Sequence, residues 1–193
     1  MQQKIINTIK ESAAVKNAIL ENPAIIASIH DIIGKIVICY QNGGKVLFCG
    51  NGGSAADAQH LAAELSGRFY YDRAPLYAEA LHVNTSYLTA VANDYSYNEV
   101  YARLIKAMGR KGDILIGLST SGNSGNILSA LAQAKQQKML TFGLTGESGG
   151  QMKELCDLTI CIPSEVTPRI QESHILIGHI ICEMVEAALF PKQ

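Results

Sequence analysis

The chain has 193 residues, of which 48% are hydrophobic and 17% are charged, and its formal net charge is −1. A chain of this length and apolar content is expected to fold as one domain with a sizeable core, which excludes a disordered protein. The balance of 16 basic against 17 acidic residues leaves no global positive field, so we expect no nucleic-acid partner.

No run of about 18 consecutive apolar residues predicts a membrane span. The first 11 residues are mostly polar, carry both charges and lack the apolar core of a signal peptide. The five cysteines form an odd set without a C-x-x-C pair, and most lie within apolar runs, which indicates reduced core residues. We therefore expect a cytoplasmic protein with no membrane partner and no disulfide framework.

Residues 1–42 predict a pair of helices. Ile5, Ile6 and Ile9 recur at helical spacing, and Asn22-Pro23 then marks a break and a restart. Asparagine caps a helix well, and proline suits its first position, where an N–H group has no partner. The second helix is apolar on more than one side, which indicates burial either inside the core or against a second chain.

After Gly44 the pattern changes to short apolar runs that alternate with helical stretches, which is typical of a parallel sheet covered on both faces. The predicted fold is α/β: a three-layer αβα sandwich of flavodoxin-like type, preceded by the helical pair. We expect one domain over residues 1–193, with residues 1–42 in packing or oligomerisation and residues 43–193 as the αβα core. The predicted strands are 45–49, 77–81, 114–118, 140–144 and 158–162, and the predicted helices are 54–66, 84–92, 98–108, 126–136 and 169–189.

Two strand-to-helix loops are rich in glycine and small hydroxyl residues: Gly50–Ser54 and Ser119–Ser124. Glycine lets the backbone approach a ligand closely, and a helix N-terminus offers free N–H groups to an anion. Neither loop has the spacing of a dinucleotide-binding or Walker motif. Each loop alone is also compatible with an ordinary turn whose serines cap a helix. Together, at the carboxyl edge of one sheet, they favour a phosphate-bearing ligand.

Three groups are candidates for chemistry. His60 and Glu64 are four residues apart on one helix face, which suits a metal or an acid–base pair but also an ordinary surface pair. His179 lies in an apolar C-terminal helix, where it is a candidate acid–base group or a neutral core histidine. Asn93-Asp94 offers partners for sugar hydroxyls or a simple loop cap.

With these residues in place, the sequence resembles the phosphoheptose isomerases, a branch of the sugar-isomerase (SIS) domain family. The resemblance covers most of the chain after residue 43. The matching segments are CGNGGSAADAQHLAAELSGRF from Cys49, ANDY from Ala92, GLSTSGNS from Gly117 and RIQESHILIGHIIC from Arg169.

The resemblance implies interconversion of sedoheptulose 7-phosphate and D-glycero-D-manno-heptose 7-phosphate through an enediol. This reaction is the first step toward the nucleotide-activated heptose of lipopolysaccharide or another surface polysaccharide. By the same resemblance, Glu64 is the base and His179 its partner acid–base group. The residues implied in substrate binding, besides Glu64, are Ser119, Thr120, Ser121 and Ser124 for the phosphate and Asn51, Gly52, Gly53, Ser54, Asn93, Asp94 and Gln171 for the rest of the sugar.

The resemblance also implies one zinc ion per subunit, held by His60, Glu64, Gln171 and His179, and a homotetramer with sites near subunit interfaces. Gln171 and His179 are eight residues apart, about 12 Å along a helix, so one ion reaches both only under a special arrangement. Three arrangements would allow this: the two side chains lean toward each other, Gln171 lies at a distorted helix start, or two subunits share the site.

Three other readings stay open. A non-catalytic SIS-domain protein of the replication-initiator-associating type shares the loop pattern, but the residues that match Glu64 and His179 look replaced in that branch. A phosphosugar-sensing module would need a DNA-reading domain, for which the chain has no spare length. An isomerase of a shorter phosphosugar would use nearly the same chemistry, while the full motif set favours heptose.

Overall fold

The computed structural model describes residues 1–191, so the last two residues of the expected domain lie outside the described part. Helices and strands alternate after the N-terminal pair, as the sequence predicts. The elements in chain order are α1 (Gln2–Leu20), α2 (Pro23–Gln41), β1 (Val46–Gly50), α3 (Gly53–Ser66), β2 (Ala78–Ala80), α4 (Thr85–Asp94), the 3-10 helix η1 (Tyr97–Glu99), α5 (Val100–Met108), β3 (Ile114–Ser119), α6 (Gly125–Gln136), β4 (Leu140–Thr145), α7 (Met152–Leu155), β5 (Leu158–Cys161) and α8 (Thr167–Leu189).

The five strands form one parallel sheet in the order β2-β1-β3-β4-β5. This is the flavodoxin-like order, and it confirms the predicted fold class. The central strands are buried on both faces, which explains why they are nearly continuous apolar runs in the sequence. The strand at residues 77–81 is shorter than predicted, with three residues at the sheet edge.

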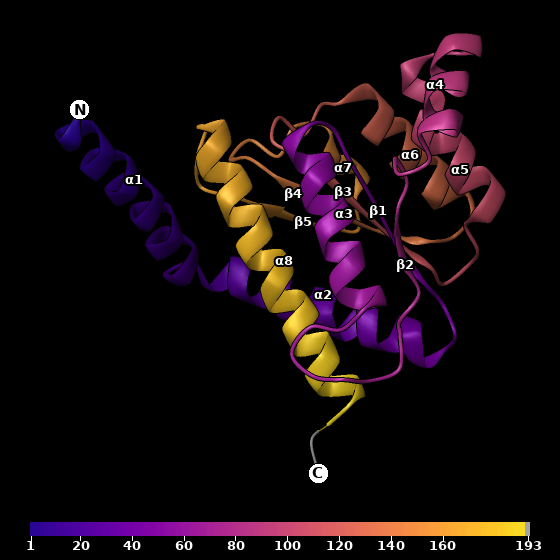
Figure 1. Ribbon diagram of the computed structural model, residues 1–193, viewed down its shortest axis with the longest axis horizontal. Coiled ribbons are helices and arrows are strands. Elements are labelled where there is room, and N and C mark those ends of the chain that lie inside the picture. Colours follow the sequence, from indigo (N-terminus) through magenta and orange to yellow (C-terminus); the bar gives the residue numbers. More distant parts are fainter. Residues whose placement is uncertain (192–193) are drawn as a thin grey trace.

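Side chains of the sheet alternate between two apolar cores. Val46 and Phe48 of β1 belong to the core that α2, α3 and α8 cover, while Leu47 and Cys49 belong to the core under α5 and α6. This period of two places one layer of helices on each face of the sheet, as Figure 1 shows. All five cysteines are free thiols, and Cys39, Cys49 and Cys182 are buried.

The N-terminal helices form as predicted. The Asn22 side chain accepts hydrogen bonds from the backbone N–H groups of Ala24 and Ile25, and Pro23 begins α2. α1 extends away from the sheet in Figure 1. It is tied to α8 by a hydrogen bond from Ser12 to Glu172 of 2.6 Å. The structure thus leaves much of α1 outside the core of its own chain.

The expectation that no segment resembles a membrane span needs a correction at α2. This helix has 19 residues, and its most apolar stretch has a mean hydropathy of 1.5 and is 28% buried. It therefore has the length and composition of a membrane span. The core helix of a soluble protein and a signal sequence share this length and composition. Asp31 and Lys35 fall inside the helix, which is why an uninterrupted apolar run is not seen in the sequence.

The helices differ from the prediction in several places, and α4 ends at Asp94 instead of residue 92. The stretch expected as one helix over residues 98–108 starts as η1 and becomes regular only at Val100. α7 follows the glycines at 149 and 150 and has only four residues, too few to show a helical period in the sequence. α8 begins two residues before the predicted start, with Pro168 in its first turn.

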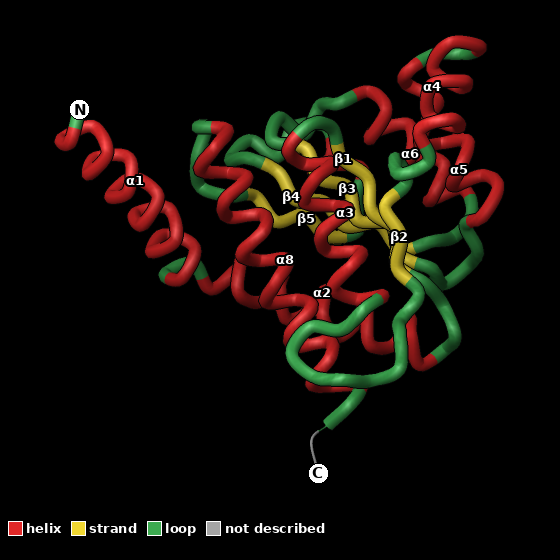
Figure 2. Tube along the Cα trace, viewed as in Figure 1, coloured by secondary structure: helices red, strands yellow, loops and turns green. Residues whose placement is uncertain are grey.

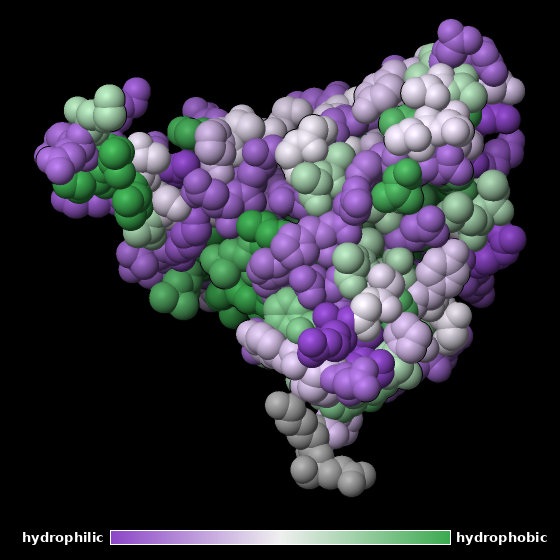
Figure 3. Space-filling view, viewed as in Figure 1, coloured by the Kyte–Doolittle hydropathy of each residue, from purple (hydrophilic) through white to green (hydrophobic). Residues whose placement is uncertain are grey.

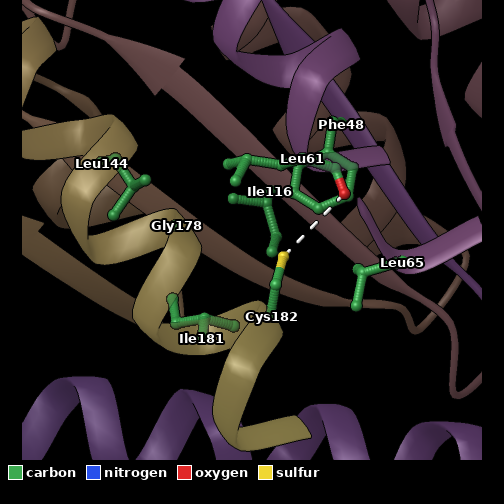
Figure 4. Close-up of a pocket in the computed structure, with 8 residues that line it drawn as sticks. All are labelled: Phe48, Leu61, Leu65, Ile116, Leu144, Gly178, Ile181 and Cys182. Atoms are coloured by element: carbon green, nitrogen blue, oxygen red, sulfur yellow. Dashed lines mark hydrogen bonds between the residues drawn. The ribbon is translucent and has the colours of Figure 1, made fainter. Parts of the chain in front are cut away.

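α3 and α8 pack closely against each other on one face of the sheet. Gly178 of α8 lies against Leu61 of α3, and a Cβ atom at Gly178 would come within 2.5 Å of the Leu61 side chain. Beside this contact, Cys182 approaches the carbonyl oxygen of Leu61, and the two helices close a small apolar cavity over Phe48 and Ile116 of the sheet (Figure 4). The absence of a side chain at position 178 therefore sets the distance between the two helices.

We expect Gly178→Ala to lower the free energy of unfolding by about 1–3 kcal/mol relative to Gly34→Ala, measured by urea denaturation. Gly34 is the matched control, because it also lies within a helix, while its added Cβ would meet no atom within 4 Å. Both variants gain about 1 kcal/mol of helix propensity, so the difference isolates the crowding against Leu61. Equal stabilities would show that the two helices are not held at this distance by Gly178.

Candidate active site

The first glycine-rich loop leads from β1 into α3. Gly52 has a φ of 57°, a conformation that favours glycine, and this turn aims the first N–H groups of α3 beyond the sheet edge. Ser54 follows in the first turn, where its side chain is buried. The loop therefore offers backbone groups, and the expectation that Ser54 contacts substrate stays a prediction.

The second loop, between β3 and α6, gathers hydroxyl groups. The Ser119 hydroxyl lies 2.9 Å from that of Ser124 and 3.4 Å from that of Ser121. Thr120 and Ser121 line an open groove together with Glu147 and Ser164. The loop is built as predicted, a set of neutral donors at the carboxyl edge of the sheet.

The two loops are joined by a pair of asparagines. Each amide of Asn51 and Asn126 donates to the other, at 2.9 and 2.8 Å, and the Tyr97 hydroxyl donates to the same Asn51 oxygen at 3.0 Å. Asn126 is almost fully buried, so this pair fixes one loop against the other. Sequence analysis missed Asn126 and Tyr97. The available signal for Asn126 was a polar residue on the buried face of an amphipathic helix, four residues before Ala130.

The predicted chemical groups converge between α3 and α8. Nε2 of His60 lies 3.0 Å from a carboxylate oxygen of Glu64 and 3.4 Å from Nε2 of His179. One ligand atom from each of these three residues lies within 4.8 Å of the others. Residues 119 positions apart in the sequence thus form one cluster, through the close packing at Gly178.

The donors in this cluster fit a zinc ion. Two imidazole nitrogens and one carboxylate oxygen form a His₂Glu set, which is typical of catalytic zinc sites that keep a fourth position open. Glu64 is partly exposed and His60 more so, so a substrate can approach the cluster. This arrangement can bind a divalent metal or, alternatively, hold an acid and a base beside each other.

Asp57 is a further acidic residue at the cluster that sequence analysis missed. It lies one turn before His60 on α3, and its Oδ2 atom is buried without a hydrogen-bond partner among the described residues. Burial raises the pKa of Asp57, while the nearby His60 and His179 lower it. Its spacing of three residues before His60 was the signal that pointed to the same helix face.

Three further predicted site residues have contacts other than with His60, Glu64 or His179: they are Gln171, Asn93 and Asp94. Gln171 is the fifth residue of α8, in regular helix, which rules out a distorted helix start, and its amide lies against Gly53. Asn93 and Asp94 are at the end of α4, where the Asn93 amide donates to Asp94 at 2.9 Å. The roles of these three residues remain predictions from the resemblance.

Comparison with known proteins identifies the same family as the sequence motifs. The family model described as "SIS domain" matches residues 9–146. The chain is 51% identical to the phosphoheptose isomerase of Aneurinibacillus thermoaerophilus over 98% of this chain and 96% of that protein. It is 53% identical to phosphoheptose isomerase 2 of Campylobacter jejuni over 94% of this chain and 90% of that protein.

A solved structure agrees over nearly the whole length. The phosphoheptose isomerase GmhA of Neisseria gonorrhoeae superposes with a TM-score of 0.91 at 38% identity, covering 96% of this chain and 98% of that one. The fold, the length and the sequence of this chain therefore all match those of phosphoheptose isomerases. The chain belongs to the SIS domain family, and within it to the phosphoheptose isomerases.

Proposed function

We propose that this chain interconverts sedoheptulose 7-phosphate and D-glycero-D-manno-heptose 7-phosphate in the cytoplasm, at the head of nucleotide-activated heptose synthesis for lipopolysaccharide or another surface polysaccharide. The observation that carries the proposal is the cluster of Glu64, His60 and His179, in a chain about half identical to phosphoheptose isomerases. A protein that only bound phosphosugars would need the hydroxyl loop but not a base beside an imidazole. Free cysteines throughout the chain are compatible with a reducing compartment.

The hydroxyl loop would hold the phosphate. Ser119, Thr120, Ser121 and Ser124 supply neutral donors, and the start of α6 adds backbone N–H groups and a partial positive charge. Asn51, held by its pair with Asn126, would fix the sugar hydroxyls beside the first loop, with Gly52, Gly53 and Ser54. Asn93, Asp94 and Gln171 complete the proposed substrate contacts.

The chemistry moves a proton between the first two carbons of the sugar. Glu64 would remove the proton from C1 of the ketose, which leaves an enediol, and return it to C2 to give the aldose. His179 would exchange the proton between the two neighbouring oxygens, so that no charge accumulates on either. Glu64 and His179 lie in the same cluster, so both could reach the adjacent carbons C1 and C2 and their oxygens.

A zinc ion bound by His60, Glu64 and His179 would polarise the sugar oxygens as a Lewis acid. Gln171 is the proposed fourth ligand, either by leaning along α8 or from a second subunit that shares the site. A carboxylate that is tightly bound to a metal is a weaker base. Glu64 would therefore act as a base when it is not tightly bound to the ion.

We expect the metal-loaded protein to convert sedoheptulose 7-phosphate to the aldoheptose phosphate in deuterated water, with deuterium at C2 detected by NMR. Glu64→Gln and His179→Gln should each lower kcat by about 10²–10⁴-fold, the usual contribution of a proton-transfer group. Glu154→Gln and His30→Gln are matched controls on exposed residues outside the site and should keep full activity.

Turnover of a shorter phosphosugar without turnover of the heptose would replace the proposed substrate. Full activity in Glu64→Gln would remove its role as base. Binding of phosphosugars without any turnover, with and without zinc, would favour the non-catalytic type of SIS protein.

We also propose a homotetramer with sites near the subunit interfaces. Large apolar side chains of α1 and α2 lie on the surface of the single chain, and Figure 3 shows apolar surface along α1 and beside α8. Such a surface is unusual for a monomer and typical of an interface. The exposed apolar residues on the two helices are Ile5, Ile6, Ile9, Leu20, Ile26 and Ile38.

Light scattering of the purified protein should give four times the chain mass of 20.8 kDa. Ile9→Asp, at a side chain that is 63% exposed, should shift the protein to smaller species, because a carboxylate in an apolar interface costs several kcal/mol. Lys10→Asp, at the neighbouring exposed position, is the control. A monomer at all concentrations would contradict the proposed assembly.

A further inference from the structure

A buried ion pair joins the loop after α3 to the far end of α8. Arg73 and Glu186 have side chains that are only 2% and 1% exposed, and Nε of Arg73 donates to a carboxylate oxygen of Glu186 at 3.1 Å. The loop over residues 67–77 runs from the end of α3 past the end of α8 to β2 (Figure 2). Neither the sequence patterns nor the proposed chemistry gives these two residues a role.

The Arg73 guanidinium closes the C-terminal end of α3. Its Nη2 donates to the carbonyl oxygen of Glu64 at 3.0 Å, and its Nη1 donates to that of Leu65 at 2.8 Å and that of Gly67 at 3.0 Å. A cation is favourable at a helix C-terminus, where the last carbonyls have no helical partners. Arg73 thus binds the backbone of Glu64, the residue whose carboxylate belongs to the cluster.

Glu186 holds the loop that follows α3. Its two carboxylate oxygens accept the backbone N–H groups of Phe69 and Tyr70, both at 2.8 Å. Burial alone would raise the pKa of Glu186, but these two N–H groups and Arg73 outweigh it, and the pKa is lowered. The carboxylate is therefore ionised, and it accepts hydrogen bonds from three N–H groups.

Both ends of this arrangement reach the His60–Glu64–His179 cluster. The Phe69 ring lies 5.8 Å from the His179 ring, centre to centre, and Glu186 is two helical turns beyond His179 on the same face of α8. Arg73 holds Glu64 through its carbonyl. The pair thus connects the α3 side of the cluster to the α8 side at the end opposite to the substrate loops.

We propose that the Arg73–Glu186 ion pair is a positioning device that fixes Glu64 relative to His179 and thereby sets the affinity of their cluster for a divalent metal. The inference rests on the metal-binding part of the proposed function. Neither residue touches the metal or the sugar. A lysine at position 73 keeps the charge but not the forked set of donors, so it cannot bind the carboxylate and the carbonyls of α3 together.

The test is Co²⁺ binding to the metal-free protein, followed by visible absorption, with Zn²⁺ affinity from competition and no sugar present. Residues that orient metal ligands typically contribute 10–100-fold to affinity, so we expect a loss of that size in Arg73→Lys and Glu186→Gln. Circular dichroism at the same temperature establishes that each variant is folded.

A second ion pair provides the matched control. Lys45 and Asp113 are also buried, at 12% and 4% exposure, but they join the starts of β1 and β3, away from the cluster. Lys45→Met should lower the melting temperature and leave the affinity for Co²⁺ unchanged. If Glu186→Gln fails to fold, Arg73→Lys carries the test alone, because it keeps the charge of the pair and removes the forked donors that bind Glu186 and the carbonyl groups of α3.

Metal affinities equal to wild type in folded Arg73→Lys and Glu186→Gln would overturn the proposal, as would the same loss in Lys45→Met. A wild-type protein that binds no Co²⁺ would also overturn it. Because binding is measured without substrate, an absence of isomerase activity alone would count against the proposed reaction and not against this inference.

Discussion

The close approach of α3 and α8 builds the candidate active site. Glycine at position 178 allows it, and the result is that His60 and Glu64 from one helix meet His179 from the other. Their short separation follows from backbone packing, since neither helix could bring three such groups together alone. The cluster therefore exists only in the folded chain, and the packing distance decides its geometry.

The two ends of the α3–α8 pair differ in chemistry. The N-terminal end of α3 adjoins the hydroxyl loop through the Asn51–Asn126 pair, and it offers neutral donors suited to an anion. The C-terminal end is closed by Arg73 and Glu186, which are sealed from water. The closed end thus carries the buried ion pair, while the hydroxyl loop offers neutral donors that can hold a phosphate without a full positive charge.

Much of this structure could be predicted from the sequence. The alternation of apolar runs and helical stretches predicted the sheet and its covering, and Asn22-Pro23 predicted the restart at α2, because both follow from local chemistry. The meeting of His60 with His179 was predicted only through resemblance, since a separation of 119 positions leaves no periodic signal. Asn126, Asp57 and the Arg73–Glu186 pair were missed, because their roles depend on tertiary contacts between distant segments.

An anomalous diffraction map, recorded at the zinc edge from crystals of the zinc-loaded protein, would show whether the packing of α3 on α8 builds a metal site. We expect one strong peak per chain within bonding distance of Nε2 of His60, a carboxylate oxygen of Glu64 and Nε2 of His179, whose ligand atoms already lie within 4.8 Å of one another. A peak elsewhere, or fully zinc-loaded crystals in which these side chains stay hydrogen-bonded to each other without a metal, would contradict it.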